Sequence, residues 1–418
     1  MALIVQKFGG TSVADIDCIQ NAARRIAFEH KRGHQLVVVV SAMAGVTDQL
    51  IQYVNATTPH PRAEEYDVVV SSGEQVTSGL LALALQNFEI SARSFQAWQI
   101  PIRTDHLHAK ARVNDICTSL LEETLQQGII PVISGFQGLS PSGRMTTFGR
   151  GGSDITAVAL AAALGASRCD LYKDVSGIYT ADPRIVPTAR KLDRVSYEEI
   201  LELASLGSQV LQHRAIELAM SYRVPVRVFS SFEESTGTEI VHEDEIMEKA
   251  LIHGITHTHS EAKITLTQVT SQPGVTAEIF GALADAGVTV DMIIHNNLES
   301  RDLSPLAFTI ARMDLPQAQA TLQKLKTSLD FGDTIVDQMT AKISVVGIGL
   351  RTHPHLTGTL FRTLSQRGIE ILGVATSEIK ISILVHQDFA ELAVRSLHSA
   401  YQLDGETAEK PMLYAVKV

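Results

Sequence analysis

The 418-residue sequence has little cysteine and too few basic residues to balance its acidic ones. Its three cysteines, Cys18, Cys117 and Cys169, are dispersed and form no C-x-x-C pair. This pattern is typical of reduced thiols in a cytoplasmic protein and argues against a structural disulfide. The formal net charge of −11 argues against the basic patch that nucleic-acid binding requires. We therefore expect a cytoplasmic protein that binds no nucleic acid.

The sequence also lacks the segments that a membrane would need. No basic region followed by a long apolar run stands at the N-terminus, so we expect no secretory signal. No apolar stretch approaches the ~20 residues of a membrane-spanning helix. With 45% hydrophobic and 19% charged residues, the chain is long enough to bury a large core in two or more domains.

A glycine-rich turn follows the first apolar run, residues 3–5. Lys7, Phe8, Gly9 and Gly10 predict a buried strand that opens into a tight turn. Glycines let main-chain N–H groups approach an anion, and the lysine adds a positive charge. The segment is neither a Walker A loop nor a G-x-G-x-x-G fingerprint. Taken alone, it fits a triphosphate site and a plain structural turn about equally.

A second glycine-rich segment, residues 147–154, leads into residues 155–164, whose alanine and leucine content predicts a helix. Ser153 or Asp154 is expected as the N-cap, and the open helix N-terminus suits an anion. Arg150 offers the planar fork that grips a carboxylate. The alternative interpretation is a glycine-rich turn with a capping aspartate.

Strands and helices alternate up to about residue 230. The continuous β-branched run at residues 36–40 is typical of a strand buried on both faces. Further strands are predicted over 68–70 and 129–133, a hairpin over 140–143, and helices over 76–86 and 115–127. This alternation predicts an α/β fold with a mostly parallel sheet between helices, and ligands gather at the carboxyl ends of such strands.

Beyond residue 231 the composition changes, first to a polar, acidic stretch and then to an internal repeat. Residues 262–265 recur as 341–344, and the positions of Pro273, Thr276, Phe280, Leu283 and Gly287 recur as Pro354, Thr357, Phe361, Leu364 and Gly368. Each copy is predicted as a βαββαβ, ferredoxin-like unit. The expected domains are 1–232, a linker over 233–248, and the two repeats over 249–340 and 341–418.

Four motifs, residues 7–12, 72–75, 148–154 and 174–184, resemble in this order those of the aspartate kinases. The resemblance implies the amino acid kinase fold and the reaction ATP + L-aspartate → 4-phospho-L-aspartate + ADP, with Mg²⁺. That reaction begins the pathway to lysine, threonine and methionine. The tandem repeat then resembles a pair of ACT domains, which bind amino acids such as lysine or threonine as feedback effectors.

The resemblance also implies roles for individual residues. Lys7 and Asp154 are expected to be catalytic, with Arg150 on the α-carboxylate and Glu74 on the α-ammonium of aspartate. Expected substrate contacts are Ser41, Thr47, Glu74, Arg150, Gly151, Gly152 and Ser153. Expected nucleotide contacts are Lys7, Phe8, Gly9, Gly10, Lys173, Asp174, Tyr179, Arg184 and Gln209. Expected effector contacts are Ser271, Gln272, Gly274, Val275, Thr276, Asp291 and Asn296.

The sequence departs from the family pattern in both halves. Gln209 stands where the family commonly has a phosphate-binding lysine, and Lys173 fills a position often held by a small hydroxyl residue. His213 stands where a proline is usual. Two effector-site carboxylates are absent, one at Ser271 and one within 304–308, and His355 replaces a usual glycine. An effector site is expected to persist with weaker coupling.

Two other functions stay open beside an active aspartate kinase. One is an amino-acid-sensing ACT protein whose kinase domain is weakened; the other is a kinase of the same fold that acts on another carboxylate, such as glutamate. The pair His257 and His259 is interpreted as strand surface, without a metal site. Expected assembly is a homo-oligomer, or a complex with a short second subunit from an internal start at Met247.

Overall fold

The structure is a computed structural model of the chain, and it divides the protein into two compact units. The described residues are 2–205, 211–245, 251–270, 274–295, 303–326, 328–329, 331–350 and 353–404. Of these, residues 2–178, 191–205 and 211–245 form the N-terminal unit, while 179–190 and the residues from 251 onward form the C-terminal unit.

The N-terminal unit is built on an eight-stranded sheet with the order β10-β12-β11-β9-β1-β2-β6-β3. Its strands are β1 (Leu3–Phe8), β2 (Gln35–Val40), β3 (Ala92–Phe95), β6 (Ile130–Ser134), β9 (Arg168–Lys173), β10 (Arg194–Ser196), β11 (Val226–Ser230) and β12 (Thr238–Val241). All neighbours pair in parallel except β11 with β12. The predicted mostly parallel sheet is therefore confirmed.

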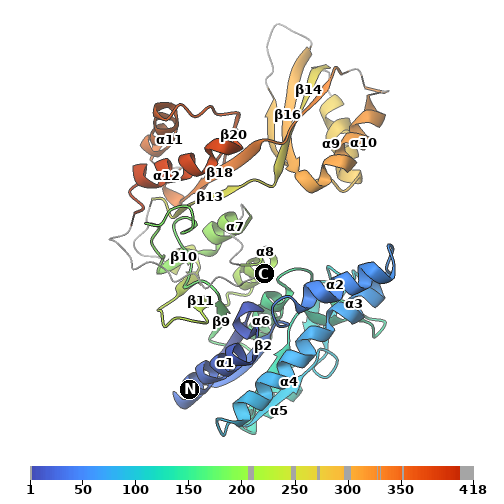
Figure 1. The fold of residues 1–418 in the computed structure, drawn as a ribbon, viewed down its shortest axis with the longest axis vertical. Helices are drawn as coiled ribbons and strands as arrows, with labels where there is room; N and C mark the ends of the chain where they lie inside the picture. The colour runs from blue at the N-terminus through green and yellow to red at the C-terminus, as the bar shows by residue number, and fades with distance from the viewer. Residues whose placement is uncertain are drawn as a thin grey trace. The chain divides into compact units, whose positions relative to one another are not determined.

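Helices cover both faces of this sheet. They are α1 (Ile16–Lys31), α2 (Val46–Thr57), α3 (Ala63–Val70), α4 (Ser72–Gln86), α5 (Ser119–Gln126), α6 (Gly152–Ala163), α7 (Tyr197–Ser205) and α8 (His213–Ser221), with a short 3-10 helix at Thr11–Val13. Helices α1 and α4 lie side by side (Figure 1). Their apolar residues pack against Ile4, Leu36 and Val38 of the sheet. Because strand side chains alternate in direction, Lys7 points to the opposite face, where α6 packs.

A four-stranded sheet, β5-β4-β7-β8, lies beside this core. Its strands are β4 (Ile102–Thr104), β5 (Val113–Ile116), β7 (Gln137–Leu139) and β8 (Met145–Thr147). The antiparallel β7–β8 pair forms the hairpin predicted at residues 140–143. The strand predicted over 68–70 is wrong: these residues end helix α3, because three β-branched residues are too short a run to separate strand from helix. The helix predicted over 115–127 is present as α5 (Ser119–Gln126), but its predicted start is wrong, since residues 115–116 end strand β5.

The predicted linker over 233–248 is also wrong, because it contains strand β12. Of the acidic residues that suggested a linker, Glu233 and Glu234 precede this strand, and Glu243–Glu245 form a 3-10 helix after it. Thr238 is fully buried, and its hydroxyl donates to the carbonyl of Leu192 at 2.6 Å. The polar, acidic composition suggested a linker and did not show that the chain returns to the sheet here.

The C-terminal unit contains two four-stranded sheets, each covered by helices on one face (Figure 1). The first has the order β15-β16-β14-β17 and comprises β14 (Glu261–Thr270), α9 (Val275–Asp285), β15 (Val290–His295), β16 (Leu303–Ala311), α10 (Leu315–Leu325) and β17 (Thr334–Asp337). This is the predicted βαββαβ order. Its core includes Ile264, Leu266, Ile279 and Phe308.

The second sheet departs from the prediction in one strand. It has the order β13-β18-β20-β19 and comprises β13 (Gly254–Thr258), β18 (Thr340–Val346), α11 (Pro354–Gln366), β19 (Gly373–Thr376), β20 (Lys380–His386) and α12 (Ala390–Ala400). The boundary at 249 assigned β13 to the first repeat, yet β13 pairs with β18 of the second. The described residues contain five 3-10 helices. The first is Thr11–Val13, and the other four are Glu243–Glu245, Arg312–Asp314, Ile348–Leu350 and Gln387–Phe389.

Residues 179–190 leave the N-terminal unit and pack in the core of the second repeat. Ala181, Val186 and Ala189 are buried there beside β13 and α12. The fully buried His398 of α12 is hydrogen-bonded through Nε2 to the hydroxyl of Thr180 at 2.9 Å. This stretch carries part of the fourth motif, so the motif is divided between the two units.

One helical stretch, Ala63–Gln86, is 24 residues long and has mean hydropathy 1.4 over its most apolar window. By length and composition alone it passes as a membrane span, which the sequence analysis did not expect. However, 56% of the window is buried inside the protein, as in a core helix of a soluble fold. The stretch also contains Glu74, a buried carboxylate of the site described below.

Candidate active site

The first glycine-rich turn brings a buried lysine to the end of strand β1. Lys7 is 4% exposed, and the chain then turns through Gly9 and Gly10 into the 3-10 helix at Thr11–Val13. The φ angles of Gly9 and Gly10 are not positive, so neither glycine is needed for a left-handed backbone. A Cβ at Gly10 would meet the carbonyl oxygen of Ala42 at 3.1 Å. Close approach of two backbones is therefore one reason for glycine at position 10.

One expected backbone donor of this turn is already occupied. The N–H of Gly9 donates to the carbonyl of Tyr172 at 3.2 Å, which extends the pairing of β1 with β9. The interpretation that Gly9 offers its N–H to an anion is therefore wrong for this conformation, because the strand pairing continues into the turn.

The second glycine-rich segment connects β8 to α6 through two left-handed residues. Gly149 and Gly151 have φ of +79° and +73°, a conformation that favours glycine. Gly151 is the N-cap residue of α6, so the prediction that Ser153 or Asp154 caps this helix is wrong. Asp154 instead lies in the first turn, 1% exposed, with its carboxylate bound by two lysines.

These lysines and Asp154 form a buried ion cluster. The Nζ of Lys7 lies 2.7 Å from Oδ1 of Asp154, and the Nζ of Lys173 lies 2.7 Å from Oδ2. Burial lowers the pKa of Lys7 to about 8, although Asp154 opposes that effect. Burial would raise the pKa of Asp154, but the charges of Lys173 and Lys7 outweigh it and lower the pKa to about 2. With both lysines protonated, the cluster carries one net positive charge.

The cluster borders a cavity of about 300 Å³ within the N-terminal unit. The expected site residues that line the cavity are Lys7, Gly10, Ser41, Thr47, Glu74, Arg150, Gly151, Gly152 and Ser153. Tyr66, Ala109 and Phe136 line it too, although no motif in the sequence marked them. Residues from four separate segments therefore converge, because each follows a strand end or opens a helix beside one.

Glu74 lies in the first turn of α4 and is 3% exposed. Its Oε1 accepts the N–H of Ala42 at 3.0 Å, while Oε2 is buried and has no hydrogen-bond partner among the described residues. Burial raises the pKa of Glu74 to about 7, against the lowering effects of that hydrogen bond and of Lys7. The carboxylate thus has one oxygen available for a donor in the cavity.

Arg150 is exposed at the cavity wall. Within the described residues no hydrogen bond or ion pair of its guanidinium is recorded, unlike the neighbouring Arg144, which pairs with Glu65 at 2.5 Å. A planar cation that is not used by the fold is well suited to grip a ligand carboxylate.

Asp174, Tyr179 and Arg184, which were also expected to contact the nucleotide, are not among the residues that line this cavity. Asp174 is exposed just after β9. Tyr179 packs against the core of the second repeat, and Arg184 pairs with Asp182 at 2.7 Å, both in the C-terminal unit. Gln209 lies outside the described residues. Their nucleotide roles stay predictions.

Three of the four described effector residues lie at the start of helix α9, and the fourth, Asp291, lies on strand β15. Gly274 is the N-cap residue of α9 with φ of +104°, and Val275 and Thr276 open the helix. Asp291 of β15 forms an ion pair with Lys342, which also pairs with Glu261. Ser271, Gln272 and Asn296 lie outside the described residues.

The two histidines interpreted as strand surface lie at the end of β13. The rings of His257 and His259 are 5.1 Å apart in an edge-on arrangement. In the described ranges, no group of three or more His, Cys, Asp or Glu side chains is placed to hold a metal ion.

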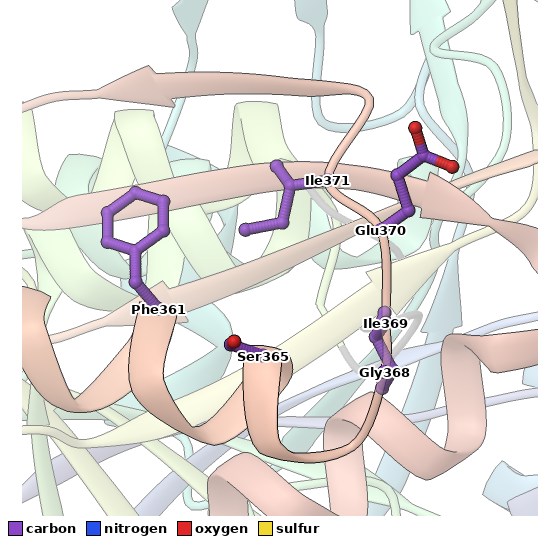
Figure 2. Close-up of a pocket in the computed structure, with 6 residues that line it drawn as sticks. All are labelled: Phe361, Ser365, Gly368, Ile369, Glu370 and Ile371. Carbon is purple, nitrogen blue, oxygen red and sulfur yellow. The ribbon is translucent and has the colours of Figure 1, made fainter.

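A second cavity, of about 480 Å³, lies in the second repeat. Figure 2 shows Phe361 and Ser365 projecting from α11, with Glu370 and Ile371 on the segment that follows the helix. Phe361 is 40% exposed, so this hollow is an open, largely apolar surface with a single carboxylate. It is separate from the residues expected to bind an effector in the first repeat.

Family comparisons agree with the division of the chain. The model of the amino acid kinase family matches residues 2–230, and ACT domain models match residues 263–328 and 343–401. The N-terminal unit is therefore an amino acid kinase domain, and the chain continues with two ACT domains.

Relatives that match over the whole chain show which amino acid kinases it resembles. The aspartate kinase of Pseudomonas putida is 44% identical over 97% of this chain and 98% of its own length, and Aspartokinase 2 of Bacillus subtilis is 44% identical over 96% and 98%. Aspartokinase III of E. coli in complex with aspartate and ADP superposes with a TM-score of 0.80 at 26% identity, covering 95% of this chain and 99% of that one. The chain belongs to the aspartate kinase family.

Proposed function

We propose that the protein transfers the γ-phosphoryl group of ATP to the side-chain carboxylate of L-aspartate, and that its ACT domains regulate this activity. The observation that carries the proposal is the buried Lys7–Asp154–Lys173 cluster at the edge of a cavity that also presents Arg150 and Glu74. Cationic groups, a carboxylate clamp and a free carboxylate oxygen are the parts that this reaction needs.

Lys7 faces the transferring phosphoryl group and neutralises charge on its oxygens. Phosphoryl transfer depends on positioning and charge stabilisation rather than on covalent catalysis. Asp154 keeps Lys7 charged in spite of burial, since its carboxylate opposes the loss of the lysine proton. Lys173, held on the other oxygen of Asp154, adds a second cation.

Aspartate is held at both ends of its backbone. Arg150 binds the α-carboxylate, and the free Oε2 of Glu74 accepts from the α-ammonium. Ser41, Thr47 and Ser153 line the same cavity and supply hydroxyl groups. The nucleophile is the side-chain carboxylate of the substrate itself, which is ionised at neutral pH, so the reaction needs no general base.

Magnesium belongs to the proposal as the ion of the nucleotide. Both oxygens of Asp154 face lysines, and the described residues contain no group of three metal-binding side chains. A site without its own set of metal-binding side chains is suited to a Mg²⁺ ion that is held mainly by the phosphate oxygens of the nucleotide and by water. When bound, Mg²⁺ neutralises phosphate charge.

The alternative of an ACT protein with a weakened kinase domain rests on Gln209, where the family commonly has a lysine. The position of Lys173 favours the active enzyme, because its ammonium group lies in the same cluster as Lys7. A kinase acting on glutamate would need room for one more methylene group between Arg150 and Lys7.

ATP turnover over a panel of acidic amino acids tests the proposal. With hydroxylamine present to trap an acyl phosphate, we expect hydroxamate formation with L-aspartate and little with glutamate. A preference for glutamate would mean that the protein is a glutamate kinase of the same fold. If no acid is turned over while amino acids still bind, the protein is better described as an amino-acid-sensing ACT protein.

The raised pKa of Glu74 predicts an acid limit on aspartate use. Because the carboxylate is protonated below a pKa of about 7, kcat/KM for aspartate should fall as the pH drops through that value. Glu74→Gln should lower kcat/KM and remove this limb, since glutamine does not titrate there. Steady-state rates from pH 5.5 to 9 measure both effects; an unchanged acid limb in the variant would assign it to another group.

Regulation by lysine, threonine or both belongs to this proposal. The T-state structure of E. coli aspartokinase III holds lysine and aspartate and superposes with a TM-score of 0.73 at 26% identity, covering 95% of this chain and 99% of that one. In this chain α9 begins after Gly274, so its N-terminal N–H groups face an effector carboxylate. We further propose a cytoplasmic homo-oligomer, or a complex with a short subunit that begins at Met247.

Feedback should be weak because the effector-site carboxylates are missing at Ser271 and in the 304–308 strand. Inhibition should be only roughly five- to ten-fold, at the low end of the ~1–3 kcal/mol typical of allosteric coupling. Lysine alone or threonine alone should inhibit less than both together. Activity titrations with lysine and threonine, singly and together at millimolar levels, measure this. Complete inhibition by one of them at micromolar concentration would contradict the assignment.

A further inference from the structure

A closed loop contributes one residue, Ala109, to the wall of the active-site cavity. Residues 105–112 connect β4 to β5, and their ends are joined because the N–H of Asp105 donates to the carbonyl of Arg112 at 3.1 Å. The Oδ1 of Asp105 accepts from the N–H groups of Leu107 and Arg112, each at 3.1 Å. At its apex Ala109 lines the cavity with φ of +62°, an uncommon conformation for a residue with a side chain.

The loop lies directly against the segment that presents Arg150. The N–H of Ala111 donates to the carbonyl of Thr147 at 3.0 Å. A Cβ on Gly149 would lie 3.1 Å from the carbonyl oxygen of Ala109. The position of this loop therefore determines the space available to residues 147–149, immediately before Arg150.

A buried carboxylate on α3 holds the loop and the segment together. Asp67 is fully buried and bonded to His108 Nδ1 at 2.7 Å. It also accepts the N–H of Ala109 at 3.1 Å and the hydroxyl of Thr147 at 2.6 Å. A buried carboxylate is costly unless donors surround it, so this geometry is strongly preferred over one in which the loop has moved away.

A second clamp holds the same two segments from α8. The guanidinium of Arg214 donates through Nη1 to the carbonyl of Phe148 at 3.1 Å and through Nη2 to the carbonyl of Ala111 at 2.6 Å. Two helices thus fix the loop to the Arg150 segment by independent contacts. Asp67 is the clamp nearer the cavity, since its neighbour Tyr66 and its partners Ala109 and Thr147 all line that space.

We propose that Asp67 is a positioning residue for aspartate, acting through His108, Ala109 and Thr147 to keep Arg150 where it meets the substrate carboxylate. This rests on the proposed kinase function. Asp67 itself does not line the cavity, whereas the segments it holds form the wall next to Arg150. Its loss therefore affects the aspartate end of the site and leaves the Lys7 cluster in place.

Asp67→Asn tests the proposal in the full-length protein. The amide keeps the side-chain size but replaces one acceptor oxygen with a donor that faces the same N–H and O–H groups. Loss of a charged hydrogen bond is expected to raise KM for aspartate roughly 10- to 50-fold, with KM for ATP changing less than about two-fold. Hydrogen exchange should show faster exchange at the amides of Ala109 and Ala111.

Asp115→Asn is the matched control. Asp115 lies on the adjacent β5 and pairs with Arg103 at 2.7 Å, but this pair is exposed. The same chemical change there should alter neither KM nor the exchange of the loop. If Asp67→Asn does not fold, His108→Ala removes one donor only and should raise KM for aspartate in the same direction by a smaller factor.

The outcomes separate this inference from the kinase function. Wild-type turnover with aspartate tests the function alone, and the exchange experiment reports the clamp even if no substrate is turned over. An equal rise of both KM values, or unchanged loop exchange in Asp67→Asn, would overturn the positioning role. Unchanged kinetics in both variants would overturn it as well.

Discussion

Replacing Lys7 by alanine should leave the protein folded and reduce kcat by about two to three orders of magnitude, or ~3–4 kcal/mol of transition-state stabilisation. The lysine is the buried cation at the end of β1, paired with Asp154 at 2.7 Å. Charge that develops on the transferring phosphoryl group would lose its closest protein partner, so turnover should suffer more than substrate binding. Steady-state kinetics together with thermal unfolding measure both. A variant that keeps more than about a third of wild-type kcat would remove Lys7 from catalysis.

The pH dependence of the activity tests the role of Lys7 a second time, because two substitutions should shift it in opposite directions. Because Lys7 loses its proton above a pKa of about 8, kcat/KM for ATP should fall on the alkaline side of that value. Asp154 raises this pKa and Lys173 lowers it. Asp154→Asn should therefore move the alkaline limb to lower pH, and Lys173→Met should move it to higher pH. Shifts in the same direction would contradict the cluster as described.

Replacing Arg150 by lysine should raise KM for aspartate about 10- to 100-fold, because a bidentate clamp becomes a single point charge worth ~1.5–3 kcal/mol less. KM for ATP should change far less, since Arg150 lines the cavity without belonging to the Lys7 cluster. Initial rates with each substrate varied in turn measure the two constants.

Arg144→Lys is the matched control for this change. Arg144 is six residues upstream, 40% exposed, and pairs with Glu64 and Glu65. The same substitution there should leave both KM values within about two-fold of wild type. Equal effects of Arg150→Lys on both substrates would mean that Arg150 serves the nucleotide or the fold.

Local sequence was sufficient to predict the structure where a glycine-rich turn also carries residues of the expected active site. The glycines at 149 and 151 require left-handed backbone, and the apolar runs at 3–5 and 36–40 become adjacent parallel strands, Leu3 beside Gln35. Since parallel strands bring their carboxyl ends to one edge, the place of Lys7 at such an edge could be predicted without a structure. Arg150 follows β8, an antiparallel strand of the smaller sheet, so the edge of the parallel sheet does not explain why it lines the same cavity.

Local sequence was insufficient where the partner of a residue lies far along the chain. The valines at 68–70 suit a strand or a helix, and only their packing in the N-terminal unit selects α3. Strand β12 follows an acidic turn that composition alone assigns to a linker. Strand β13 joins the second ACT sheet rather than the nearer first one, a choice that depends on a sheet edge formed by distant residues.

The sequence by itself determined the family, the glycine-rich turn after β1 and the types of residue expected in the active site, because these depend on motifs of a few consecutive residues. Only the tertiary structure decided which charged side chains pair with one another. The sequence does not indicate that Asp154 pairs with two lysines instead of capping its helix. Asp67 lies in no motif, yet it is buried among three donors from two other segments, the loop with His108 and Ala109 and the strand end at Thr147, beside the wall of the cavity. Burial and pairing are properties of residues brought together from distant parts of the chain, so they appear only when the chain is folded.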